Sequence, residues 1–95
     1  MITTEFGRRM YENASLGTDH GRGFALMTLS DRIKGGRILG AWPAVVENKS
    51  GTGPGGMKIE HDYRSVFLEV LRGSMGVQKP EMVFPNFTAG KVGLV

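Results

Sequence analysis

Cysteine is absent from the 95 residues of this chain. Its absence excludes a disulfide scaffold, a thiolate metal site and a cysteine nucleophile. Long apolar runs are absent too: none approaches the roughly 20 residues of a membrane-spanning helix, and no basic and then apolar leader opens the chain. We therefore expect no membrane partner, and a cytoplasmic location for the chain as encoded.

A large excess of charge is also lacking, since 12 Lys and Arg residues face 9 Asp and Glu residues, a net charge of +3. The densest basic stretch is Arg32, Lys34 and Arg37. No aromatic residue lies between these side chains to stack on bases, as single-stranded nucleic-acid sites commonly require. The sequence therefore favours a solvated turn over a nucleic-acid site. The affinity of a nucleic-acid site would depend steeply on the salt concentration.

Glycine is what the sequence has in abundance, with 15 residues, about twice the roughly 7% share of an average protein. One group, Gly17, Gly21 and Gly23, surrounds an Asp-His pair. A second group lies within Ser50–Gly56. We interpret the first group as backbone shaped around a ligand and the second as an exposed, flexible loop tip.

The expected fold class is mixed α/β, or α+β as a stand-alone piece, with few short strands and one clear helix. The β-prone Met1–Thr4 is expected to be a strand, and the polar Glu5–Gly23 a long loop with a helical turn near Arg8–Glu12. The apolar Phe24–Leu29 predicts a strand buried on both faces. It is expected to pair as a hairpin with a second strand at Arg37–Leu39.

The clearest predicted element is an amphipathic helix. Its apolar stripe follows the spacing i, i+3, i+4, i+7 and i+8, at Tyr63, Val66, Phe67, Val70 and Leu71. Asp62 is placed to cap the N-terminus, and Gly73 to be the C′ residue with positive φ. Further along, Val83, Phe84 and Phe87 are expected to dock on the body of the protein.

The pair Asp19-His20 is the first candidate site, because a carboxylate and an imidazole are ligands of divalent metals. Flanking glycines would let an irregular loop aim both side chains at one ion, and Arg22 could contact an anion held there. The alternative is a chance pair, since His61-Asp62 is a second one in the same chain.

Glu5 and Arg8 are the second candidate group. They directly follow the first predicted strand, and ligands of open α/β sheets bind at the carboxyl ends of strands. The alternative is an ordinary i, i+3 ion pair on the surface.

Six short motifs follow one another along the chain. They are Thr4–Arg8, Glu12-Asn13, Gly17–Gly21, Lys34–Arg37, Gly40–Pro43 and Asp62–Arg64. From about Thr3 to about Phe87 the chain resembles the C-terminal part of a bacterial family of uncharacterised sulfatase-like proteins in the alkaline phosphatase/sulfatase superfamily. The combination of the Thr-Glu-Phe-Gly-Arg and Gly-Thr-Asp-His-Gly blocks carries most of this similarity.

The resemblance implies an α/β sandwich with a central sheet and a site for one or two divalent metal ions, where phosphate or sulfate esters are hydrolysed. By motif match, Asp19 and His20 would be metal ligands, whereas Glu5 and Arg8 match without an established role. The nucleophile and most other ligands of such proteins lie in a segment before the part that this chain resembles. We therefore expect no catalytic residue here and a chain that is not catalytically complete by itself.

The resemblance also implies that residues 1–95 are a single small domain forming an incomplete part of a larger sulfatase-like domain, whose full-length relatives are often exported. The alternative is a non-catalytic small domain that acts by self-association or by binding a partner. Strand edges and apolar patches left by an incomplete sheet would then be covered by another chain. We expect Phe24–Leu29 and Tyr63–Leu71 to be the surfaces that become buried in a homo-oligomer.

Overall fold

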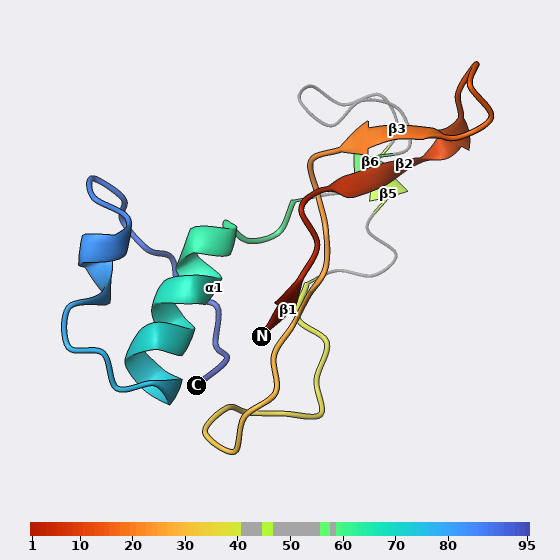
Figure 1. The fold of residues 1–95 in the computed structure, drawn as a ribbon. Helices are drawn as coiled ribbons and strands as arrows, with labels where there is room; N and C mark the ends of the chain where they lie inside the picture. The colour runs from red at the N-terminus through yellow and green to blue at the C-terminus, as the bar shows by residue number, and fades with distance from the viewer. Residues whose placement is uncertain (41–44, 47–55, 58) are drawn as a thin grey trace. The chain divides into compact units, whose positions relative to one another are not determined.

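The computed structural model describes residues 1–40, 45–46, 56–57 and 59–95 (Figure 1). The chain divides into two compact units, the first formed by Met1–Thr28 with Gly40–Glu60 and the second by Leu29–Leu39 with His61–Val95. In the described residues, short antiparallel strand pairs and one α-helix make this a mixed α+β protein, which confirms the expected class. In the residues that the structure describes, no helix is long and apolar enough to cross a membrane.

Among the described residues of the first unit, the strands form three two-stranded antiparallel pairs. The pairs are β1 (Ile2–Thr3) with β4 (Leu26–Met27), β2 (Gly7–Glu12) with β3 (Thr18–Gly21), and β5 (Val45–Val46) with β6 (Gly56–Met57). The predicted loop tip falls mostly on residues 50–55, which lie outside the described residues.

The prediction of a long loop at Glu5–Gly23 is wrong, because the segment forms the β2–β3 hairpin. The side chain of Asn13 organises its turn: the amide oxygen accepts hydrogen bonds from the backbone N–H groups of Ser15 and Gly17 at 3.0 and 3.1 Å. Such Asn side chains take the place of a backbone turn. The strands were hidden in the sequence because their exposed polar residues leave no apolar alternation.

The prediction of a doubly buried strand at Phe24–Leu29 is also wrong. Only Leu26 and Met27 form a strand, and its partner is β1 instead of Arg37–Leu39. Met27 is 59% exposed, since a two-stranded pair has no second layer to bury both of its faces. Ile38, which is in no strand, is 88% exposed. In the second unit, Arg37 donates its side-chain hydrogen bonds to the carbonyl oxygens of Lys34 and Gly93, and no strand includes it.

Two glycines of the first unit allow a close approach of backbones. A Cβ atom added to Gly7 would overlap the carbonyl oxygen of Gly23, and one added to Gly23 would lie 2.8 Å from the carbonyl oxygen of Met57. The glycines near the Asp-His pair thus include one, Gly23, that allows the backbone after β3 to pack closely against β6. Our interpretation of that group as backbone shaped around a ligand does not account for Gly23.

The helix of the second unit is α1 (Tyr63–Glu69), which continues as a π-helical turn, η1 (Val70–Ser74). The side chain of Asp62 accepts a hydrogen bond from the N–H of Arg64 at 2.9 Å, which confirms the predicted N-cap. The prediction that Gly73 ends the helix with positive φ is wrong, because Gly73 lies inside η1. The residue with positive φ is Gly76, at +70°.

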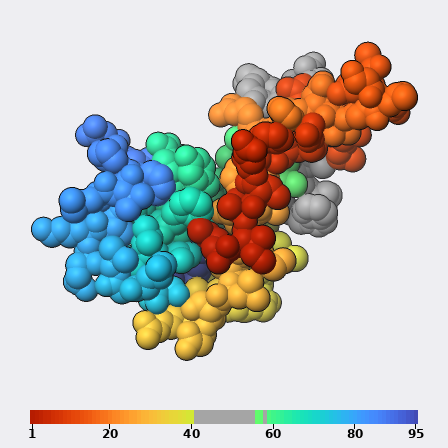
Figure 2. Space-filling view, in the orientation of Figure 1, coloured from red at the N-terminus to blue at the C-terminus, as the bar shows by residue number. Residues whose placement is uncertain are grey.

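The core of the second unit forms where an aromatic cluster and a short 3-10 helix, η2 (Pro80–Val83), pack against the helix. In Figure 2 the blue C-terminal residues lie against the blue-green residues of the helix. Rings of Tyr63, Phe67 and Phe84 lie 5.6 to 6.3 Å apart, centroid to centroid. Their tilted and edge-on geometry is a favoured one for aromatic pairs. Docking by Phe84 is thus confirmed, and the apolar stripe of the helix meets this cluster within the same chain.

The most buried side chains of the helix differ in part from the predicted stripe. Ser65, Val66 and Leu68 are buried, at 4, 8 and 4% exposure, whereas Tyr63 keeps 46% of its surface exposed. Ser65 and Leu68 lie one helical turn apart on the side of the helix that the C-terminal residues cover. A polar residue and an apolar one outside the predicted stripe therefore join the core.

Candidate anion-binding site

The β2–β3 hairpin brings together the two sequence blocks that carry the candidate residues. Arg8 lies opposite His20, and Gly7 lies opposite Gly21, in an antiparallel register. Side chains of directly opposed residues project from the same face of such a pair. A basic side chain from the Thr4–Arg8 block therefore stands beside the imidazole from the Gly17–Gly21 block.

Phe6 completes this group, which we call the hairpin cluster: Phe6, Arg8 and His20. The ring centroids of Phe6 and His20 are 4.0 Å apart, and the guanidinium carbon of Arg8 lies 5.4 Å from the centroid of Phe6. Arg8 also donates a hydrogen bond of 2.7 Å to the carbonyl oxygen of Thr18. The cluster therefore orders a guanidinium and an imidazole on one exposed face.

Asp19 is separated from this cluster by the alternation of the strand. Successive side chains of a strand point to opposite faces, so Asp19 and His20 project away from each other. The carboxylate of Asp19 accepts a hydrogen bond of 3.0 Å from the side-chain amide of Asn13. The expectation that an irregular loop aims both side chains at one point is wrong, because residues 18–21 form strand β3.

The described residues do not by themselves assemble a complete metal site. Protein metal sites normally supply three or more ligands that converge. Among residues 1–40, 45–46, 56–57 and 59–95, no group of three or more His, Asp or Glu side chains is placed to hold an ion. Metal ligation by Asp19 and His20 stays a prediction from the resemblance.

The two remaining candidates lie at the ends of the hairpin. Glu5 precedes β2 and is exposed; Arg22 follows β3 and is exposed. The predicted surface pair of Glu5 with Arg8 is wrong, since Arg8 bonds to the carbonyl oxygen of Thr18 instead.

Reasoning from the sequence did not assign a role to Phe6, because a single aromatic residue between polar ones gives no pattern. The signal that could have revealed its role is its spacing from Arg8. If β2 and β3 are paired with Arg8 opposite His20, Phe6 lies two residues before Arg8 and therefore on the same side of the strand.

The fold and this site define a small mixed α+β protein that presents a basic and aromatic cluster on a β-hairpin. The chain belongs to the family described as a protein of unknown function (DUF1501), whose model matches residues 1–53, that is, 53 of the 95 residues. The match includes the whole hairpin cluster. No curated protein and no solved structure matches the chain.

Proposed function

We propose that the hairpin cluster binds the anionic group of a phosphate or sulfate ester, as part of a sulfatase-like metal-dependent hydrolase whose catalytic apparatus is not complete within this chain. The observation that supports this proposal most is the opposition of Arg8 and His20 across β2 and β3. It joins the two sequence blocks on which the resemblance to sulfatase-like proteins rests.

The chemistry of the cluster suits an oxyanion. A guanidinium presents a planar fork of N–H donors that matches phosphate geometry, and a neutral imidazole still carries one N–H donor. The contact with Phe6 restricts the imidazole, so less conformational entropy is lost on binding. Because the cluster lies on the surface, where water screens charge, we expect millimolar rather than micromolar dissociation constants.

The binding part of the proposal is tested by titrating the full chain with inorganic phosphate, sulfate and p-nitrophenyl phosphate while recording amide and side-chain NMR shifts. We expect saturable shifts at Arg8 and His20, and a loss of most of the affinity in Arg8→Ala. Arg9→Ala is the matched control: it removes the same charge from the neighbouring position, whose side chain contacts the main-chain carbonyl of His20. Equal losses in both variants, or no saturable shift, would contradict the proposal.

The hydrolytic part is tested with aryl phosphate and sulfate esters in the presence of Mn²⁺, Zn²⁺ or Ca²⁺. We expect no turnover by this chain, because no third metal ligand accompanies Asp19 and His20 among the described residues, and the nucleophile of sulfatase-like proteins lies before the part that this chain resembles. Turnover that disappears in His20→Ala would show that the chain is a complete enzyme. Metal-induced shifts confined to Asp19 and His20 would support their role as ligands.

Self-association is a second candidate, supported by the β1–β4 pair. Ile2 and Met27 lie opposite each other there and are 60 and 59% exposed. A two-stranded pair with apolar side chains and free edges is a common place for another chain to bind. Light scattering over a range of concentrations tests it, with Met27→Lys expected to shift the mass toward the monomer; a monomer at high concentration would contradict it.

A further inference from the structure

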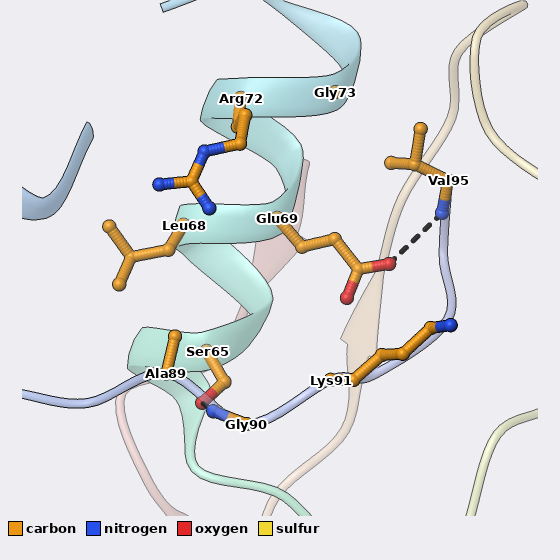
Figure 3. A pocket seen from close by; sticks show the side chains of 9 residues that line it. All are labelled: Ser65, Leu68, Glu69, Arg72, Gly73, Ala89, Gly90, Lys91 and Val95. Atoms are coloured by element: carbon orange, nitrogen blue, oxygen red, sulfur yellow. Dashed lines mark hydrogen bonds between the residues drawn. The ribbon is translucent and has the colours of Figure 1, made fainter. Parts of the chain in front are cut away.

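The carboxylate of Glu69 binds the main chain of the C-terminal segment, residues 89–95, at four consecutive N–H groups. One carboxylate oxygen accepts hydrogen bonds from Val92 and Gly93 at 2.9 and 3.1 Å, and the other from Leu94 and Val95 at 2.5 and 3.1 Å. Figure 3 shows the Glu69 side chain extending from the helix toward Val95.

Consecutive N–H groups that converge on one point form a concave site for anions, known as a nest. Nests require a change of backbone hand, and Gly93 supplies it with a φ of +89°. The convergence at Glu69 therefore reflects the local conformation of the segment as well as the position of the carboxylate.

The carbonyl side of the same segment is held by the loop at residues 29–39. The N–H of Lys34 donates a 2.7 Å hydrogen bond to the carbonyl oxygen of Leu94, and Arg37 donates one of 2.6 Å to that of Gly93. At the start of the segment, the N–H of Gly90 donates to the Ser65 hydroxyl at 2.9 Å. These contacts keep the four N–H groups oriented toward the helix.

A cavity of about 410 Å³ lies beside the carboxylate, between helix and segment (Figure 3). Its lining includes two cationic side chains, Arg72 and Lys91. Arg72 pairs with Glu81 at 2.9 Å and is 62% exposed. The surroundings of the nest therefore have room and positive charge for an anion larger than the carboxylate of one side chain.

We propose that the N–H groups of Val92–Val95 form a binding site for small oxyanions of the carboxylate and phosphate class, with Glu69 as its internal ligand. The C-terminal segment is held by anion binding, and a free oxyanion takes the place of Glu69 when that carboxylate is removed. This proposal does not depend on the function of the hairpin cluster, whose residues belong to the other unit.

The experiment uses the full chain carrying Glu69→Ala, with hydrogen exchange of the amides of residues 92–95 as the readout. Hydrogen bonds to a charged group are stronger than those between neutral groups, so we expect exchange at these amides to accelerate about tenfold or more. Acetate or inorganic phosphate should then restore protection in a saturable manner, whereas chloride at equal ionic strength should not.

Glu81→Ala is the matched control, because it removes a carboxylate that pairs with Arg72 and does not contact the segment; it should leave the four amides protected. Glu69→Gln keeps the size of the side chain and should lose protection without rescue, because its amide still fills the nest. Unchanged protection in Glu69→Ala, or acetate and phosphate acting no better than chloride, would overturn the proposal. If Glu69→Ala unfolds, as helical circular dichroism would show, refolding induced by acetate supports the proposal and its absence overturns it.

Discussion

Arg8 and His20 stand directly opposite each other in the β2–β3 hairpin, although they are 12 positions apart in the sequence. This relationship changes the chemistry that the sequence suggests. Adjacent Asp19 and His20 look like a pair of ligands when read along the chain, but the strand turns them to opposite faces. The hairpin instead pairs the imidazole with a guanidinium, an arrangement suited to an anion.

Replacement of Gly23 by alanine should destabilise the first unit by about 1–3 kcal/mol, the usual cost of overpacking. The new Cβ would lie 2.8 Å from the carbonyl oxygen of Met57, a backbone atom that cannot move independently. Chemical denaturation measures the change. Gly35→Ala is the control, since nothing lies within 4 Å of its Cβ position, and an equal effect of both variants would contradict the packing role.

Leu16→Asn at the tip of the hairpin should stabilise the protein by up to about 1 kcal/mol. Leu16 has a φ of +59° and is 86% exposed, and left-handed backbone costs an ordinary L-residue roughly 1–2 kcal/mol. Asn tolerates this conformation better. Leu29→Asn is the control: it removes a similarly exposed leucine without positive φ and should leave the stability almost unchanged. A higher melting temperature in both variants would show that the gain comes from removing an exposed leucine and not from the backbone conformation.

Asp62→Ala should destabilise the helix by about 1 kcal/mol, the typical cost of losing an N-cap. The carboxylate of Asp62 accepts the N–H of Arg64 and also pairs with its guanidinium at 2.7 Å. Glu81→Ala serves as the comparison, since it breaks an exposed ion pair with Arg72 of the kind worth about 0–1 kcal/mol. Urea denaturation measures the loss of stability in each variant. A larger loss in Glu81→Ala than in Asp62→Ala would contradict the capping role of Asp62.

Acid should weaken the second unit through Glu69. Partial burial raises the pKa of Glu69, but hydrogen bonds from the N–H groups of Val95, Val92, Gly93 and Leu94 together hold it below its ordinary value of 4.5. A carboxyl with a lowered folded-state pKa stabilises the fold above its unfolded pKa, and this contribution is lost as pH falls through the folded value.

The free energy of unfolding should therefore decrease as the pH is lowered below about 4.5. The cationic side chains near Glu69 are Arg72 and Lys91, which line the same cavity, and Arg37, which bonds to the carbonyl oxygen of Gly93. Glu69→Gln should reduce the acid slope, measured by denaturation between pH 7 and 3. Asp62, whose pKa is lowered chiefly by the side-chain hydrogen bond from Arg64, should account for part of the remaining slope. An unchanged slope in Glu69→Gln would contradict this account.

The fold class and the helix could be predicted because their signals are local. The apolar spacing at Tyr63, Val66 and Phe67 marks a helix, and Asp62 precedes it as a capping residue should. The end of the helix could not be predicted from Gly73, because η1 continues through it and the side chain of Val95 covers it. A contact between residues so distant in sequence leaves no local pattern.

By itself, the sequence determined the mixed α+β class, the helix with its N-cap, the membership of a family of unknown function over residues 1–53, and the residue types available at the site. Only the tertiary structure decided which of them meet. Strand register, with a side-chain period of two, sets Arg8 beside His20 and separates His20 from Asp19. The docking of residues 92–95 turns Glu69 from a helical surface acid into the ligand of four backbone N–H groups. Both outcomes depend on long-range pairing of main-chain atoms, which every residue carries alike and which the order of side chains therefore does not reveal.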